Sequence, residues 1–307
     1  MTEGRPSATA LHIARMLVFA SEDRGIKEMI PPTTVQMSRK YIQEASPGSA
    51  RLLSLFRLEW ARRLVRMLEH ITIPGMTLHY VVRKLHLENV VRQGLRDGYI
   101  HLVVLGAGFD TLTQRLADEA EFRPMSMVEV DYPATERIKT KVLGGMRFNR
   151  QVRYVSSDIG NADLNALMRE CRAEVEGART IVLAEGLLMY FEPSVVSSLI
   201  RAIRSEFGPE VRVAFTFMEP QAGGRIAFKR QIRIVDYWLR HRGESFRWGI
   251  PASNVAAFLA QHGLRSLELM DKDRFTEAYL KPRHLTRAYL ADGDHLCVAE
   301  GLTDRSI

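Results

Sequence analysis

Cysteine is scarce in this chain of 307 residues, and its scarcity excludes two kinds of site. Cys171 and Cys297 are the only cysteines, too few for a disulfide framework and without the spacing of metal ligands. The nine histidines form no H-x-x-x-H or H-E-x-x-H pattern. The sequence therefore predicts no metal, and we interpret both cysteines as structural thiols rather than nucleophiles.

Long apolar runs are also missing. The run from Ile181 to Tyr190 is interrupted by Glu185 and falls far short of the roughly 20 residues that a membrane span needs. The N-terminus carries no basic segment followed by an apolar stretch and a cleavage site. We therefore expect a cytoplasmic protein with no membrane partner.

The chain contains neither an internal repeat nor a linker rich in proline, glycine and serine. Its content of 46% hydrophobic and 26% charged residues is that of an ordinary globular protein. A chain of this length can bury one large core, so we predict a single domain over residues 1–307. Nothing in the sequence indicates the oligomeric state.

Positive charge is concentrated in one segment. The chain has a formal net charge of +7, and the segment 225–247 holds seven Lys or Arg against two acids, a net +5. The segment is either a solvated helix face or a basic wall beside an active site that attracts an anionic substrate. The uneven distribution makes a nucleic-acid partner the less favoured interpretation.

Residues 1–99 have helical periodicity and predict a helical cap. Between Arg51 and His70 the apolar residues recur at helical spacing, which predicts one helix docked on the core rather than lying on a membrane surface. A further helix is expected from Leu78 to Leu95. The apolar positions of the first helix are Leu52, Leu53, Phe56, Trp60, Leu64 and Met67.

Short apolar runs then alternate with helical segments, as in βα units around a parallel sheet. We predict a Rossmann-like α/β core over residues 100–218 and 251–307, with a seven-stranded, mostly parallel sheet whose last strand is antiparallel. Helices are expected after Pro193 and after Pro251. The expected strands are His101–Leu105, Met125–Val130, Val152–Val155, Thr180–Ala184, Val211–Phe217, Leu264–Leu269 and His295–Ala299.

Residues 219–250 interrupt this alternation with arginines and aromatic residues. The insertion lies between two expected strands, near the strand ends where open α/β sheets bind ligands. We therefore predict that it is a substrate lid.

The loop after the first strand reads Leu105-Gly106-Ala107-Gly108-Phe109-Asp110-Thr111. Its two glycines let the backbone turn tightly and approach a ligand closely. A dinucleotide-binding loop would carry a third glycine where Thr111 stands. The loop therefore favours a ligand without a pyrophosphate over a nicotinamide dinucleotide.

Acidic residues follow the next two strands. Glu129 and Asp131 stand 23 and 25 residues after Gly106, close to the interval at which an acid binds ribose hydroxyls in nucleotide folds. Asp158, followed by Ile159, ends the third strand, where an acid can accept from an adenine amino group. Together these acids predict a nucleoside site at one edge of the sheet.

Four motifs in order resemble the leucine carboxyl methyltransferase family, whose bacterial members include polyketide O-methyltransferases of the tetracenomycin type. They are HLVVLGAGFDTLTQRLA, VEVDYPATERIKTKVL, SSDI and LAEGLLMYFEP, with Arg83 upstream in HYVVRKLHLENVV. The resemblance covers about residues 75–206. One departure is IPPTTVQMSRKYI, which lacks the Asp-Pro pair common in bacterial relatives and puts the substrate type in doubt.

The resemblance implies S-adenosylmethionine as the cofactor, without a metal. Arg83 would pair with the carboxylate of its methionine part, and Glu185 would face its amino group. Tyr190 and Arg83 are the expected catalytic residues; the alternatives are a core aromatic and a structural ion pair. The other expected cofactor contacts are Gly106, Ala107, Gly108, Asp110, Glu129, Asp131, Asp158 and Ile159.

The expected acceptor is an oxygen of a small carboxylic acid or polyketide-like molecule. A carboxylate has a reference pKa of about 4 and needs no base at pH 7, whereas a hydroxyl often needs one. No His or Asp within the motifs stands out as a base, which favours a methyl ester. The alternatives are a phenolic or alcohol hydroxyl acceptor, a non-catalytic S-adenosylmethionine-binding or RNA-associated protein, and a nicotinamide-dependent dehydrogenase.

Overall fold

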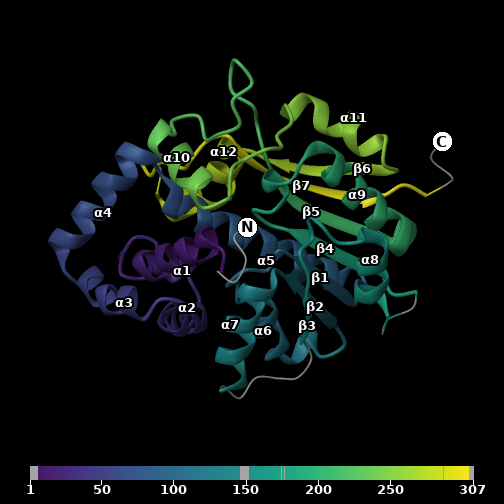
Figure 1. The fold of residues 1–307 in the computed structure, drawn as a ribbon, viewed down its shortest axis with the longest axis horizontal. Helices are drawn as coiled ribbons and strands as arrows, with labels where there is room; N and C mark the ends of the chain where they lie inside the picture. The colour runs from purple at the N-terminus through teal and green to yellow at the C-terminus, as the bar shows by residue number, and fades with distance from the viewer. Residues whose placement is uncertain (1–5, 146–151, 174, 176, 286, 304–307) are drawn as a thin grey trace.

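Seven strands form one sheet at the centre of the structure, in the order β3-β2-β1-β4-β5-β7-β6 (Figure 1). The structure is a computed structural model that describes residues 6–145, 152–173, 175, 177–285 and 287–303. Within these residues only β7 is antiparallel to its neighbours, so the predicted sheet is confirmed. The strands are β1 (His101–Leu105), β2 (Ser126–Asp131), β3 (Val152–Ser156), β4 (Thr180–Ala184), β5 (Val211–Met218), β6 (Leu264–Met270) and β7 (Asp294–Gly301).

Some predicted regions extend beyond the described part of the chain. Residues 1–5 of the predicted helical cap lie outside it, as do residues 146–151, 174, 176, 286 and 304–307 of the predicted core.

Helices cover both faces of the sheet, which explains why the central strands β1 and β4 are buried along their whole length rather than at alternate residues. Along β1, Leu102 and Val104 join the core on one face, and Val103 and Leu105 join the core on the other. Helices α5 (Met76–Arg96) and α6 (Leu112–Ala117) pack on the first face. Helices α8 (Leu164–Arg172), α9 (Pro193–Phe207) and α11 (Val255–Ala260) pack on the second.

The register of the parallel strands brings several loops to one edge. Leu105 at the end of β1 pairs with Val130 near the end of β2, and Val104 pairs with Leu183 of β4. The loops that follow β1, β2, β3 and β4 therefore emerge side by side, at the edge where open α/β sheets bind ligands.

The N-terminal residues form helices that gather over this edge (Figure 1). Helix α1 packs through Ala14 and Val18 on Phe109, which follows the glycine turn. The helices are α1 (Ala8–Ala20), α2 (Pro32–Ala45), α3 (Pro47–Ala50) and α4 (Glu59–Thr72), and α7 (Pro133–Gly144) packs beside α2. Short turns of 3-10 or π helix occur at Lys27–Met29, Arg51–Arg57, Ala120–Phe122, Leu188–Tyr190, Gly208–Glu210, Ala252–Asn254, Thr276–Leu280 and Lys281–Arg283.

The prediction of one docked helix from Arg51 to His70 is wrong. The chain forms a 3-10 turn over Arg51–Arg57, extends at Leu58 and only then enters α4, which buries Ala61 alone. Trp60 and Met67 of the expected buried stripe are 60% and 51% exposed. Periodicity identifies the apolar face of a helix, but the bend at Leu58 turns this face away from the core.

The insertion (residues 219–250) contains α10 (Arg233–His241), while α12 (Lys272–Phe275) follows β6. Helix α10 begins beside the end of α4, where the Ile232 amide donates to the Thr72 carbonyl at 3.2 Å. The amides of Glu219 and Lys229 tie the insertion to the residues before β7. None of the helices in the described ranges is both long and apolar enough to cross a membrane.

Candidate active site

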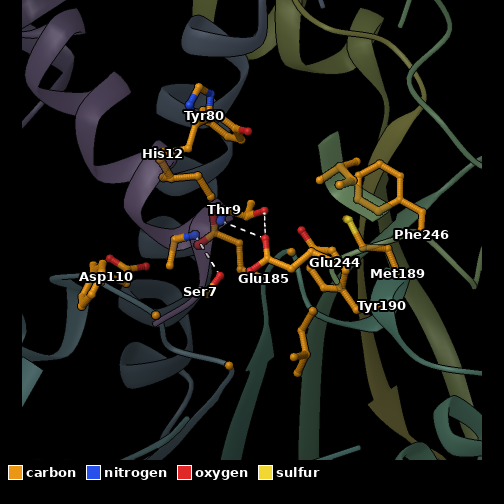
Figure 2. A pocket seen from close by; sticks show the side chains of 18 of the residues that line it. Ser7, Thr9, His12, Tyr80, Asp110, Glu185, Met189, Tyr190, Glu244 and Phe246 are labelled. Carbon is orange, nitrogen blue, oxygen red and sulfur yellow. Dashed lines mark hydrogen bonds between the residues drawn. The ribbon is translucent and has the colours of Figure 1, made fainter. Parts of the chain in front are cut away.

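A cavity of about 940 Å³ lies over the carboxyl ends of β1, β2, β3 and β4, beneath α1, α4 and the insertion. Ligand sites commonly occupy about 300–1,000 Å³, so this cavity has room for a cofactor and a small acceptor together. Ten of the eleven site residues expected from the sequence line it; Glu129 does not. Figure 2 shows a part of its lining.

The turn after β1 is built on two glycines with left-handed backbones. Gly106 and Gly108 have φ angles of +65° and +54°, which other residues rarely adopt. A Cβ added to Gly106 would lie 2.7 Å from Cδ1 of Leu187. The turn therefore exposes backbone without side chains to the cavity, as the sequence predicts. Ala107, between the two glycines, lines the cavity as well.

Asp131 ends β2 and places its carboxylate in the cavity wall. It accepts hydrogen bonds from the backbone amides of Gly108 and, at 2.6 Å, Tyr132. Burial raises its pKa to about 6 in spite of these bonds. A carboxylate in this position can accept hydrogen bonds from the two hydroxyl groups of a ribose.

Glu129 does not reach the cavity, so the expectation that it shares a ribose with Asp131 is corrected. Its carboxylate pairs with Lys139 at 2.6 Å and accepts hydrogen bonds from Thr113 and, at 2.9 Å, Gln114. The side chain is 3% exposed. Thr113 and Gln114 belong to α6 and Lys139 belongs to α7, so the Glu129 carboxylate holds both helices to the sheet.

Asp158 and Ile159 follow β3 and line the cavity on its far side from β4. The Asp158 carboxylate closes its own turn by accepting from the Gly160 amide at 3.2 Å and from Asn161 at 2.9 Å. The turn is therefore preformed before any ligand binds.

Asp110 lines the cavity beyond the glycine turn, two residues before α6 begins. It accepts from the Leu112 amide at 3.1 Å and from Lys84 Nζ at 2.9 Å. Burial opposes its ionisation, but the Lys84 ammonium holds the pKa of Asp110 below its usual range. Asp110 is thus an ionised anchor for the turn.

Arg83 and Glu185 face each other at the centre of the site. Arg83 Nε donates to Glu185 Oε1 at 3.0 Å, and Arg83 Nη1 donates to Asp294 Oδ2 at 2.6 Å. Lys84 Nζ donates to the other Glu185 oxygen at 3.0 Å. Arg83, Lys84, Glu185 and Asp294 thus form one ion-pair network. All of them except Asp294 line the cavity.

Sequence analysis missed Asp294 and Lys84 in this network. Asp294 also bonds His79 Nε2 at 2.9 Å, which fixes it between two residues of α5. A signal existed in α5 itself, because His79, Arg83 and His86 recur at helical spacing in an otherwise apolar segment. Asp294, the partner of His79 and Arg83, lies more than 200 residues away along the chain, and no local pattern identifies it.

The remaining part of the cavity is largely aromatic and apolar, and it includes Tyr190. The Tyr190 ring packs on Phe246 of the insertion with centroids 5.6 Å apart. In the view of Figure 2, these two rings and Met189 lie on one side of Glu185, and His12 and Tyr80 lie on another. We call this part of the lining the acceptor region; it is formed by His12, Glu69, Tyr80, Met189, Tyr190, Glu244 and Phe246.

His12 of α1 is a further residue that the motifs did not reveal. Its ring stands edge-on to Tyr80, with centroids 6.3 Å apart. Burial, with the nearby Arg15 charge, lowers the pKa of His12 to about 4. The imidazole is therefore neutral at pH 7 and can accept a proton or a hydrogen bond.

The arginines of the insertion do not form a basic wall inside the cavity. Among the described residues only Arg247 of that segment lines it, and Arg247 is paired with Glu192 at 3.2 Å. Arg225 is bound to Asp236, and Arg233, Arg240 and Arg242 are exposed. The acids in the lining outnumber its three cations: they are Glu69, Asp110, Asp131, Asp158, Glu185, Glu192 and Glu244.

Glu244 fastens the insertion to α1. Its carboxylate accepts from the Ala8 amide at 2.8 Å. It also accepts from the Thr9 amide at 2.9 Å and the Thr9 hydroxyl at 2.5 Å (Figure 2). These amides are unpaired within the first turn of a helix, and an acid is the favourable partner there. The contact closes one side of the cavity.

Neither a metal centre nor a reactive thiol accompanies the cavity in the described part of the chain. No three His, Cys, Asp or Glu side chains there are grouped to hold a metal ion. Cys171 and Cys297 are buried free thiols outside the cavity lining, and burial raises their pKa values to about 12 and about 11.

We expect Glu244→Ala to lower the free energy of unfolding by about 1–2 kcal/mol, because it leaves two helix amides without their acceptor. Urea denaturation measures this loss. Glu277→Ala is the matched control, since Glu277 makes an exposed pair with Lys281 and its loss should change stability by under about 0.5 kcal/mol. Equal losses in both variants would show that the Glu244 contact does not fasten the insertion.

Comparisons with known proteins identify the family of the chain. A model of the family described as leucine carboxyl methyltransferase matches residues 15–204. A protein of Mycobacterium sp. (strain KMS) is 32% identical over 150 residues, 48% of each chain. One of Mycobacterium avium (strain 104) is 30% identical over 202 residues, 64% of this chain and 65% of that one. Both carry the provisional name S-adenosyl-L-methionine-dependent methyltransferase, and the match spans about half the length of the first.

Two solved structures show the same fold. A provisionally named methyltransferase from Thermobifida fusca YX superposes with a TM-score of 0.56 at 14% identity, covering 86% of this chain and 94% of that one. A DUF574 family protein from Streptomyces avermitilis MA-4680 has a TM-score of 0.52 at 12% identity, covering 94% and 96%. The predicted Rossmann-like methyltransferase fold is confirmed.

Proposed function

The chain belongs to the leucine carboxyl methyltransferase family, and from this membership and the cavity we propose an S-adenosylmethionine-dependent O-methyltransferase of small, largely apolar molecules. The observation that carries the proposal is the meeting of the glycine turn, Asp131 and the Arg83–Glu185 pair in one cavity. S-adenosylmethionine supplies a methyl group activated on a sulfonium. The chain must bind this donor and hold an acceptor oxygen in line with it.

The lining fits the parts of that cofactor in order. Asp131 is the acceptor for the ribose hydroxyls, and Asp158 with Ile159 forms the wall for the adenine. Arg83 and Glu185 present opposite charges side by side, which suits the carboxylate and ammonium groups of the methionine part. The glycine turn lets the backbone approach between these two ends.

The acceptor region then has mainly a positioning role. An in-line displacement is accelerated when the nucleophile is held at contact distance in the right direction. Tyr190, Phe246, Met189 and Tyr80 offer flat apolar walls for a ring-bearing acceptor. In this proposal Tyr190 positions the acceptor, and the insertion is the lid that covers it.

We further propose that the acceptor oxygen is a hydroxyl. The acceptor region holds the neutral His12 together with Glu69 and Glu244. The three cations of the cavity lining are already paired, Arg247 with Glu192 and both Arg83 and Lys84 with Glu185. An anionic carboxylate would meet two acids there, whereas a hydroxyl can donate a hydrogen bond to the neutral His12. The sequence-based preference for a methyl ester depended on the lack of a base within the motifs, and His12 lies outside them as a neutral partner that can orient a hydroxyl. The ester remains the alternative that the family's description favours.

Arg83→Ala should weaken binding of S-adenosylhomocysteine by about 2–5 kcal/mol, because a ligand carboxylate and two protein acids lose their shared partner. Titration calorimetry on protein shown by circular dichroism to be folded measures the effect. Arg96→Ala, an exposed change on the same helix, is the control and should bind normally. Normal binding by folded Arg83→Ala would remove Arg83 from the cofactor site.

Binding of S-adenosylhomocysteine should depend on pH through Asp131. The carboxylate is ionised above its pKa of about 6 and accepts ribose hydroxyls, so affinity is constant above about pH 7. Below pH 6 protonation removes the acceptor, and affinity falls by up to about tenfold per pH unit. Asp131→Asn should bind weakly and lose this dependence. A flat wild-type profile from pH 5 to 8 would contradict the role of Asp131.

His12→Ala should lower kcat by up to about 10²-fold, because the acceptor hydroxyl loses the hydrogen bond that orients it, while binding of S-adenosylhomocysteine stays unchanged. His284→Asn, an exposed change, is the control. The assay labels a cell extract with a tritiated methyl donor and treats the product with mild alkali, which releases methanol from an ester but not from an ether. Alkali-stable label supports the hydroxyl acceptor, and release of methanol with unchanged turnover in His12→Ala would establish the carboxylate instead.

A further inference from the structure

Two neighbouring helices leave apolar faces uncovered at the entrance of the cavity. In α4 the uncovered side chains recur at helical spacing, and α10 adds a second group. Single exposed apolar residues are ordinary, but a contiguous group of them marks an interaction site. The group, called here the entrance surface, consists of Trp60, Leu64, Met67, Leu68 and Ile71 of α4 and Ile234, Tyr237 and Trp238 of α10.

The entrance surface continues into the cavity. Leu68 and Trp238 are 50% and 38% exposed and also line the cavity. The bond between Ile232 and Thr72 joins the start of α10 to the end of α4, and both helices lie toward the left end of the molecule in Figure 1. An apolar molecule can therefore pass from the entrance surface to the acceptor region along apolar side chains.

Basic residues border the entrance surface. The acids of the two helices are engaged: Glu59 pairs with Arg62, Glu69 accepts from Thr77 and Asp236 pairs with Arg225. Glu59 also pairs with Arg63 at 3.2 Å. The other exposed arginines around the apolar side chains are Arg57, Arg233, Arg240 and Arg242. The border therefore presents net positive charge.

We propose that the entrance surface docks on an anionic lipid surface, with α4 and α10 lying in the plane of the interface. Interfacial helices combine a face of Trp, Leu and Ile with arginines on the polar side, and aromatic residues favour the headgroup level. Two of the three tryptophans, Trp60 and Trp238, lie here, whereas Trp248 is buried. This inference revises the expectation of no membrane partner, since an interfacial helix needs no membrane span.

A second copy of the chain fits the entrance surface less well. Face-to-face pairing would bring the two arginine borders together and close both entrances to the cavity. A lipid surface instead neutralises the arginines and leaves the cavity open toward a source of apolar acceptors. The delivery of an acceptor depends on the function proposed above, but the docking itself does not.

The test is flotation of the whole chain with vesicles of phosphatidylcholine alone or mixed with phosphatidylglycerol. We expect binding only to the anionic vesicles, with a blue shift of tryptophan emission and quenching by brominated lipid. Leu64→Asp should abolish binding. Leu267→Asp is the matched control, because these leucines are 44% and 43% exposed and Leu267 lies on β6. Arg233→Gln and Arg240→Gln should each weaken binding about fivefold at low salt.

Three outcomes would overturn the proposal. They are a lack of binding to anionic vesicles, equal loss of binding in Leu64→Asp and Leu267→Asp, and a dimer in sedimentation velocity that Leu64→Asp dissociates while vesicles have no effect. Calorimetry with S-adenosylhomocysteine on the same proteins separates the two proposals. Vesicle binding without cofactor binding would support the docking surface and contradict the proposed methyltransferase. Cofactor binding without vesicle binding would support the methyltransferase and contradict the docking surface.

Discussion

The buried guanidinium of Arg83 is the interaction on which the candidate active site depends. Arg83 belongs to α5, Glu185 to the loop after β4, and Asp294 to the start of β7, so one side chain joins three parts of the chain. A cation that is 2% exposed is tolerated because two acids pair with it. Helix α5 is therefore not only part of an N-terminal cap: it covers the sheet and forms a wall of the cavity.

Charge divides the cavity into two parts with different tasks. Around Arg83, Lys84, Glu185 and Asp110 every charge has a partner, so this part can hold a charged ligand with its geometry already set. The acceptor region has aromatic walls and the neutral His12 instead. The apolar character of this second part continues outward over α4 and α10. A charged donor and an apolar acceptor can thus enter one cavity without competing for the same residues.

Local patterns were enough to predict the sheet and the glycine turn. Buried strands are continuous apolar runs, and Gly106 and Gly108 are needed because their backbones are left-handed. Contacts between distant segments were not predictable in this way. Glu129 and Asp131 are two residues apart on one strand, and only the helices packed around Glu129 show that its carboxylate is already used. His12 lies outside every motif and acquires a role only because α1 folds over the glycine turn.

The most direct test of the account is a crystal structure of the chain with S-adenosylhomocysteine. The account predicts the ribose hydroxyls on the Asp131 carboxylate, the adenine against Ile159 and the methionine part between Arg83 and Glu185. The sulfur should then face the acceptor region that holds His12. A ligand bound elsewhere, or a ribose held by Glu129 with Asp131 unengaged, would contradict it.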